Sequence, residues 1–349
     1  MHSAAAVGSA APVLVVGPSW VGDMVMAQSL FAVLAARPGN PPIDVLAPAW
    51  CSGLLARMPE VRSAIPLPLG HGELGLAVRR RIGAGLRAHA YAQAIVLPNS
   101  AKSALVPWFA GIARRTGWRG ELRYGLLNDL RRLDARRLPL MVQRFVALGV
   151  DADAPLPQAP RPRLRADRAA ADALRTRLGL AAPRPVLALC PGAEFGAAKR
   201  WPEAHFAVVA GAAIDAGLQV WLFGSAGDRP VTATIRAALA PPAQAHCADL
   251  AGQTTLADAI DLLACANAVL SNDSGLMHVA AALGRPLAVV YGGSSPRFTP
   301  PLADQPALFT SALECVPCFA RTCRYGHYRC LQEQFPAPVA AAVLRLAAR

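Results

Sequence analysis

The stretch VLVVGPSWVGD, residues 13–23, decides the fold, because four aliphatic residues run directly into a short loop that contains two glycines. The apolar stretch that follows, residues 24–34, predicts a helix. A buried strand that passes through a tight loop into a helix is the repeating unit of parallel α/β sheets. We therefore expect residues 13–16 to form the first strand of such a sheet.

The same strand, loop and helix pattern recurs along the chain. Further strands are expected at residues 43–47, 94–97, 186–189, 218–223, 268–271 and 287–291. Residues 152–163 contain four prolines and no apolar periodicity, which predicts a stiff linker. The 349 residues are thus expected to form two doubly wound, Rossmann-like α/β domains facing across a cleft. We place the domains at residues 1–160 and 161–349, with the last helix able to pack back on the first domain.

The composition argues against a membrane span and against a secretion signal. Although 54% of the residues are hydrophobic, no stretch reaches the roughly 18 uninterrupted apolar residues of a membrane helix. Residues 1–12 lack the basic segment and hydrophobic block of a signal peptide. The expected compartment is the cytoplasm.

Positive charge is concentrated in the first half of the chain. Residues 1–150 carry 17 basic and 7 acidic side chains, a net charge of +10 out of +13 for the whole chain. Such an excess suits an anionic partner: nucleic acid, an acidic membrane surface or a phosphorylated substrate. The arginine runs lack the interleaved aromatic residues that stack on bases, so we expect no nucleic acid. A solvated basic face is the alternative.

The first loop does not match a dinucleotide-binding site. It lacks the G-x-G-x-x-G pattern, and the acidic residue Asp44 begins its strand rather than ending it, which argues against a dehydrogenase. The loop instead places Asp23 in the first turn of a helix, next to Gly22 and near Ser19. A carboxylate there can act as a general base, or it can simply be an acid that the helix dipole favours.

Two loops of the second half suit a phosphorylated ligand. Residues 190–202 contain glycines, among them Gly192, that let a ligand approach the backbone. The same loop carries Glu194 and the cations Lys199 and Arg200, which suit phosphate oxygens. Residues 271–278 lead from a strand into a short helix, whose N-terminus can bind an anion. Neither loop is a Walker A sequence.

The second of these loops also carries polar side chains for a sugar. Asp273 can accept hydrogen bonds from hydroxyl groups, and Ser274 and Gly275 open the helix. His278, one turn later, either is a buried core residue or faces the same ligand.

Four of the eight cysteines lie within sixteen residues, at Cys315, Cys318, Cys323 and Cys330, with His327 between the last two. Clustered thiolates are ligands that zinc and iron–sulfur clusters select, but the second C-x2-C pair of a zinc ribbon is missing. We expect a packed or redox-sensitive loop without a metal, and a bound metal is the alternative.

Six segments, taken in order, closely resemble the lipopolysaccharide heptosyltransferases of glycosyltransferase family 9. They are residues 17–24, 47–51, 115–120, 124–128, 190–202 and 272–279. The resemblance implies a GT-B fold and transfer of L-glycero-D-manno-heptose from ADP-heptose to the first heptose of the lipopolysaccharide inner core. The alternatives are another GT-B-like sugar-nucleotide enzyme, such as an epimerase, and a non-catalytic glycolipid- or nucleotide-binding protein.

The resemblance also implies partners and roles. ADP-heptose is a substrate, so no cofactor is expected, and the only D-x-D pair, Asp151 and Asp153, lies in the linker. Asp23 is expected to be the catalytic base and Lys199 the cation that neutralises the leaving ADP. The residues expected to bind the substrates are Ser19, Gly22, Gly192, Glu194, Arg200, Gly224, Ser225, Asp228, Asp273, Ser274, Gly275 and His278. Asp228, at a strand exit, is the expected partner of the ribose.

Because the donor is assigned to the second half, we expect the first half to bind an anionic lipopolysaccharide-core acceptor at the cytoplasmic face of the inner membrane. We expect a monomer that is peripherally associated with that membrane.

Overall fold

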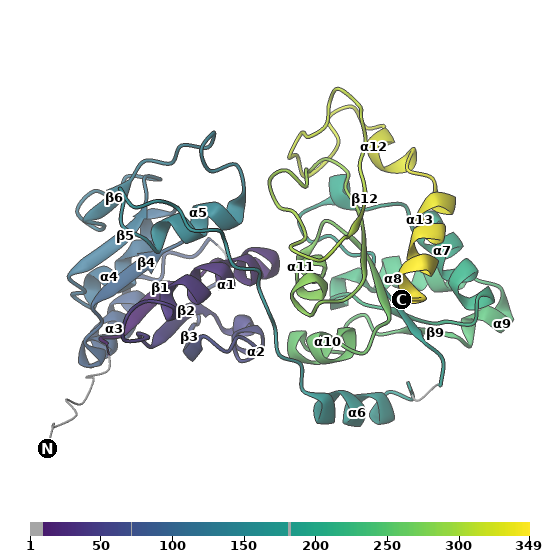
Figure 1. Cartoon of the computed structure of the whole chain (residues 1–349), viewed down its shortest axis with the longest axis horizontal. Helices are drawn as coiled ribbons and strands as arrows, with labels where there is room; N and C mark the ends of the chain where they lie inside the picture. Colours follow the sequence, from purple (N-terminus) through teal and green to yellow (C-terminus); the bar gives the residue numbers. More distant parts are fainter. Residues whose placement is uncertain (1–9, 71, 181–182) are drawn as a thin grey trace, which may run out of the picture. The chain divides into compact units, whose positions relative to one another are not determined.

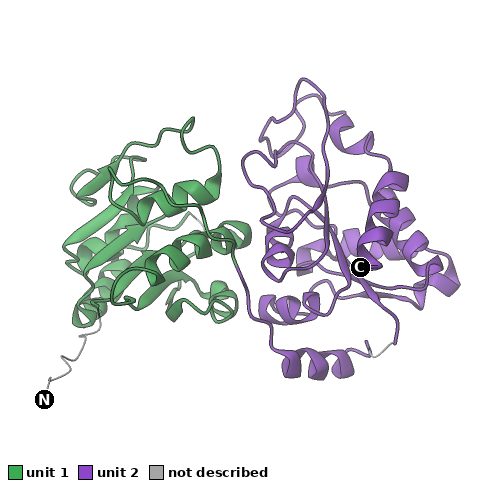
Figure 2. Cartoon of the chain, in the orientation of Figure 1, with its two compact units in different colours: residues 1–162 green, residues 163–349 purple. Residues whose placement is uncertain are grey.

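The computed structural model describes residues 10–70, 72–180 and 183–349. The chain divides into two compact units, residues 1–162 and 163–349 (Figure 2). Each unit is built on a parallel six-stranded sheet with helices packed against it (Figure 1). The predicted α/β class, with one Rossmann-like sheet in each half, is confirmed.

In unit 1 the strand order is β3-β2-β1-β4-β5-β6. The strands are β1 (Val13–Val16), β2 (Ile43–Pro48), β3 (Val61–Leu67), β4 (Gln93–Val96), β5 (Arg114–Trp118) and β6 (Asp129–Arg131). The helices are α1 (Val21–Ala35), α2 (Ser52–Leu55), α3 (Leu76–Leu86), α4 (Leu105–Phe109) and α5 (Met141–Leu148). From β1 the chain adds β2 and β3 on one side. It then returns to the other side of β1 and adds β4, β5 and β6 there. The switch between β1 and β4 is where ligands bind in sheets of this kind.

Unit 2 repeats this topology, with strand order β12-β11-β10-β7-β8-β9. Its strands are β7 (Val186–Cys190), β8 (Gln219–Leu222), β9 (Cys247–Asp249), β10 (Ala268–Asn272), β11 (Leu287–Val290) and β12 (Ala307–Phe309). Its helices are α6 (Arg168–Arg177), α7 (Glu203–Asp215), α8 (Arg229–Ala237), α9 (Pro241–Gln244), α10 (Leu256–Leu263), α11 (Gly275–Ala282), α12 (Arg329–Gln332) and α13 (Pro336–Ala347). The switch lies between β7 and β10.

The central strands are largely apolar, because helices cover both faces of a parallel sheet. Every residue of β1, β7, β10 and β11 is buried. The last helix, α13, packs against α7, β10 and β11 and contributes Val339, Val343 and Leu346 to the core of unit 2. No helix within residues 10–70, 72–180 and 183–349 combines the length and the apolar character needed to cross a membrane.

Asp44 serves the fold of unit 1. Its buried carboxylate accepts hydrogen bonds from Arg62 Nε at 2.9 Å and from Tyr91 Oη at 2.6 Å. Burial raises the pKa of Asp44, but the hydrogen bonds from Arg62 and Tyr91 outweigh it and leave the pKa below its ordinary value. The carboxylate therefore links β2 to β3 and to the segment just before β4.

Candidate functional site

The predicted residues of the second half gather at the carboxyl edge of the unit 2 sheet. They lie on the loops that follow β7, β8 and β10 or, for Gly275 and His278, at the start of α11, and these three strands are neighbours in the sheet. Because the carboxyl ends of parallel strands meet at one edge, the three loops lie together at the switch point.

Lys199 and Asp273 form an ion pair at this edge. Lys199 ends a short 3₁₀ turn after β7 (Ala197–Lys199), and its Nζ lies 2.6 Å from Oδ2 of Asp273, directly after β10. The Asp273 side chain is 3% exposed and the Lys199 side chain 20%. A carboxylate so deeply buried needs a cation beside it. The pair therefore fixes the position of the ammonium group, which retains further N–H donors for a ligand.

The surroundings of Lys199 add a second cation. Nζ of Lys199 lies 5.1 Å from the centre of the Phe195 ring, and the guanidinium of Arg321 lies 5.1 Å from the centre of the same ring. Glu194 and Arg200 are exposed on the same loop. Lys199 from the loop and Arg321 from the cysteine-rich segment thus place two cations beside one aromatic side chain.

Asn272, which sequence reasoning did not select as a site residue, holds the two loops together. Its Nδ2 donates to the carbonyl of Pro191 at 2.6 Å, and its Oδ1 accepts from the backbone N–H of Trp201 at 3.1 Å. Asn272 is completely buried, so its amide binds the chain itself and not a ligand. The signal available in the sequence was the polar pair Ser271 and Asn272 at the end of an apolar strand.

Asp228 organises the loop after β8. Its Oδ2 accepts hydrogen bonds from the backbone N–H and the hydroxyl of Ser225, both at 2.8 Å. A Cβ atom on Gly192 would lie 2.7 Å from the Asp228 carboxylate, and one on Gly224 would lie 2.7 Å from its Cβ. The structure thus shows that both glycines make room for Asp228. Their contact with a ligand stays a prediction.

The N-terminus of α11 lies directly after Asp273. Ser274 precedes the helix, with its Oγ 3.1 Å from that of Ser271, and Gly275 is the first helical residue. His278 is buried one turn later. Burial lowers the pKa of His278 to about 4, and nearby Lys199 acts in the same direction while Asp273 opposes it. His278 is therefore a neutral imidazole near pH 7.

In unit 1, the structure places Asp23 where the sequence predicted it. Asp23 lies half-buried in the first turn of α1, directly after the β1 exit loop and at the switch point of that sheet. Gly22 is its half-buried neighbour, and Ser19 is exposed in the loop before the helix. The predicted site residues thus form two groups, one in each unit.

The cysteine-rich segment braces the turn that carries Lys199. The backbone N–H of Ala198 donates to the carbonyl of Arg321 at 3.0 Å, and the carbonyl of Ala198 accepts from Gly293 at 3.0 Å. Gly293 in turn accepts from Cys318 at 3.0 Å. A narrow pocket beside Ala198 and Gly293 is lined by all four clustered cysteines, Cys315, Cys318, Cys323 and Cys330.

The thiols of this segment differ in acidity. Backbone hydrogen bonds, the strongest from Tyr328, lower the pKa of Cys323, whereas burial raises the pKa of Cys330 to about 11. Across residues 10–70, 72–180 and 183–349, no group of three or more His, Cys, Asp or Glu side chains is arranged to hold a metal ion.

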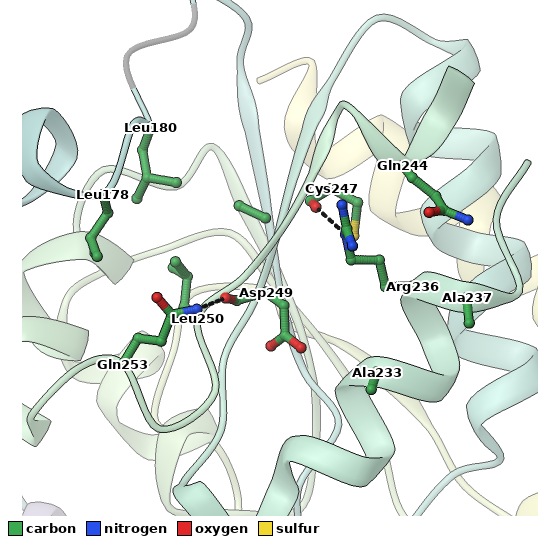
Figure 3. A pocket seen from close by; sticks show the side chains of 11 residues that line it. Leu178, Leu180, Ala233, Arg236, Ala237, Gln244, Cys247, Asp249, Leu250 and Gln253 are labelled. Atoms are coloured by element: carbon green, nitrogen blue, oxygen red, sulfur yellow. Dashed lines mark hydrogen bonds between the residues drawn. The ribbon is translucent and has the colours of Figure 1, made fainter. Parts of the chain in front are cut away.

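Another pocket lies along the edge strand β9 and contains none of the predicted site residues (Figure 3). Side chains from α8, α9 and β9 line it. Arg236 donates to the carbonyl of Cys247, and Gln253 donates to that of Asp249. These polar groups bind within the chain, so we assign no ligand to the pocket.

His278 is predicted to make the stability of unit 2 depend on pH. Its pKa in the folded chain is about 4, whereas an exposed histidine titrates near 6.5. Between these values the unfolded chain binds more protons, so stability falls as the pH drops, by at most about 1.4 kcal/mol per pH unit. We expect urea denaturation to show that the free energy of unfolding falls less between pH 7 and pH 5 for His278→Gln than for the wild type.

His205, whose pKa is also lowered by burial, is present in both proteins and acts equally in both. An identical pH dependence in the two proteins would show that His278 takes up its proton as readily in the folded chain as in the unfolded one.

Comparison with known proteins shows relatives along most of the chain. Residues 79–329 match the model of glycosyltransferase family 9 (heptosyltransferase). Lipopolysaccharide heptosyltransferase 2 of Escherichia coli K12 is 55% identical over 300 residues, which are 84% of this chain and 86% of that protein. Lipooligosaccharide heptosyltransferase 2 of Haemophilus influenzae is 51% identical over 302 residues, with the same coverage of 84% and 86%.

A solved structure, that of E. coli ADP-heptose lps heptosyltransferase II, matches with a TM-score of 0.86 and 47% identity. The match covers 97% of this chain and 98% of that one. It confirms the α/β, GT-B fold class and the expectation of a sugar-transferring enzyme. The chain therefore belongs to glycosyltransferase family 9, the heptosyltransferases.

Proposed function

We propose that this chain transfers L-glycero-D-manno-heptose from ADP-heptose to the first heptose of the lipopolysaccharide inner core. The names of its relatives, which describe lipopolysaccharide and ADP-heptose heptosyltransferases, support this assignment. The observation in the structure that carries it is the Lys199–Asp273 pair beside the N-terminus of α11. A fixed ammonium and free helical N–H groups are what a diphosphate requires.

In this proposal unit 2 binds the donor. Lys199 and the N-terminus of α11 neutralise the diphosphate, and Asp228 accepts hydrogen bonds from the ribose. The residues that we infer to complete the donor site are Gly192, Glu194, Arg200, Gly224, Ser225, Asp273, Ser274, Gly275 and His278. The neutral imidazole of His278 is able to donate or accept one hydrogen bond without repelling Lys199.

Unit 1 binds the acceptor, with Asp23 as the general base and Ser19 and Gly22 beside it. As the bond between the anomeric carbon and the ADP oxygen breaks, the acceptor hydroxyl attacks that carbon and gives its proton to the Asp23 carboxylate. Negative charge then grows on ADP, where Lys199 stabilises it. The high positive charge of residues 1–150 supports recruitment of an anionic glycolipid at the cytoplasmic face of the inner membrane by a peripherally associated monomer.

The function is tested by supplying labelled ADP-heptose with a lipopolysaccharide core that ends at its first heptose. We expect transfer of the label to this acceptor, with release of ADP. Conversion of ADP-heptose without acceptor would indicate an epimerase. Binding without turnover of either substrate would indicate a binding protein.

Lys199→Ala is predicted to lower kcat by about 10²-fold or more, the effect of removing one electrostatic stabiliser of the transition state. This substitution also leaves the Asp273 carboxylate buried without its cation, so we expect it to destabilise unit 2. The double variant Lys199→Ala/Asp273→Asn separates the two effects. It should regain thermal stability but not kcat. A single variant that keeps kcat within about threefold of the wild type would remove Lys199 from the chemistry.

Asp23→Asn is predicted to lower kcat by about 10² to 10⁴-fold, the usual gain from a general base, and to leave ADP binding nearly unchanged. Asparagine keeps the size of the side chain but is a far weaker base. Asp167→Asn is the matched control, because Asp167 caps α6 by accepting from Ala170 at 3.0 Å. That variant should lose stability and keep kcat. If Asp23→Asn behaved like Asp167→Asn, Asp23 would be a helix-capping acid only.

A further inference from the structure

The loop of residues 119–124 in unit 1 exposes a leucine and a tyrosine to solvent and buries an arginine. Leu122 is 86% exposed and Tyr124 is 59% exposed, whereas Arg123 between them is completely buried. This is the reverse of what water favours, since arginine is rarely buried and leucine usually is. Both exposed residues follow β5, at the carboxyl edge of the sheet.

Arg123 holds this loop in place by binding the neighbouring loop after β4. Its Nη1 donates to the carbonyl of Pro98 at 2.6 Å, and its Nη2 donates to Oδ1 of Asn99 at 3.2 Å and to the carbonyl of Trp118. The packing is tight, because a Cβ atom on Gly120 would lie 2.4 Å from the carbonyl oxygen of Asn99. These contacts fix the conformation of the loop, and in that conformation Leu122 and Tyr124 are exposed.

The charges around the loop are mainly positive. The guanidinium of Arg119, an exposed residue, lies 6.0 Å from the centre of the Tyr124 ring. The loop after β6, the neighbouring strand, adds three exposed arginines, Arg132, Arg136 and Arg137. The acids nearby bind the backbone: Glu121 accepts from Ala101, and Asp134 accepts from Arg136 and Arg137.

We propose that loop 119–124 docks unit 1 on an anionic lipid bilayer. Leu122 and Tyr124 enter the boundary between headgroups and acyl chains, and Arg119 with the arginines after β6 contacts the lipid phosphates. Apolar and aromatic side chains surrounded by basic ones are the pattern of surfaces that lie in a membrane interface. The inference rests on the proposed function in one respect, namely that the acceptor is a glycolipid.

Vesicle binding tests the surface without either substrate. The full chain is sedimented with phosphatidylglycerol-containing vesicles and with purely zwitterionic vesicles. We expect preferential binding to the anionic ones, a loss of about tenfold or more for Leu122→Ser/Tyr124→Ser, and a loss of about fivefold for Arg119→Gln. Val208→Ser, which replaces an exposed apolar residue on α7 in unit 2, is the matched control and should bind like the wild type.

The proposal would be overturned if the wild type did not bind anionic vesicles, or if the double variant bound them as well as the wild type does. Because the substituted side chains are exposed, the variants should keep the wild-type melting temperature. A change of oligomeric state in the double variant, seen by sedimentation, would reveal a surface for a second copy instead.

Activity on two forms of the acceptor separates a bilayer contact from a sugar contact. Leu122→Ser should keep the wild-type KM for a deacylated, soluble core acceptor and raise the KM for the acylated acceptor embedded in vesicles. An equal rise for both acceptors would place Leu122 against the sugar and overturn the proposal. If neither acceptor is heptosylated by the wild type, the proposed function fails, and the vesicle measurement still decides the docking surface.

Discussion

The contact between the Lys199 ammonium and the Asp273 carboxylate, 2.6 Å apart, is the interaction around which the site of unit 2 is arranged. A carboxylate that is 3% exposed would be costly to bury without a cation. Three segments must meet to form and hold the pair: the turn after β7, the end of β10, and the cysteine-rich segment that hydrogen-bonds the turn. The site thus depends on the fold of the whole unit, and the cysteine-rich segment has a structural part in it whether or not its thiols have chemistry of their own.

The central strands were predictable because burial on both faces leaves long apolar runs, as in β1, β7, β10 and β11. The strands that sequence reasoning missed are β3, β5, β6, β9 and β12, which lie toward the sheet edges. β5 begins with two arginines, and its Arg114 pairs with Asp129 of β6 at 3.2 Å. β5 pairs with β6 through the parallel backbone ladder, and its charged side chains look like solvated surface in the sequence.

At the site, the sequence identified residue types but not their pairing. Lys199 and Asp273 were selected for separate reasons, since nothing in the sequence joins residues 74 positions apart. Arg123 was hidden for the opposite reason, because it lies among many arginines that suggest a basic face, yet its side chain is completely buried. Gly192 was expected to admit a ligand, and only the three-dimensional contact reveals that it also makes room for Asp228.

In the proposed function, the two units attract anions by different physical means. Lys199 and Asp273 cancel in formal charge, so the attraction of this pair for a diphosphate acts at contact distance, through the ammonium and the N–H groups of α11. Arg123 is bound mainly by neutral carbonyl and amide oxygens, so its charge is not cancelled there and adds to the net +10 of residues 1–150. Charge that is not cancelled acts over about a Debye length, roughly 8 Å at physiological salt, and is weakened by added ions. The proposal therefore assigns to unit 1 a large anionic surface that is attracted from a distance, and to unit 2 a small ligand that is held by direct contacts.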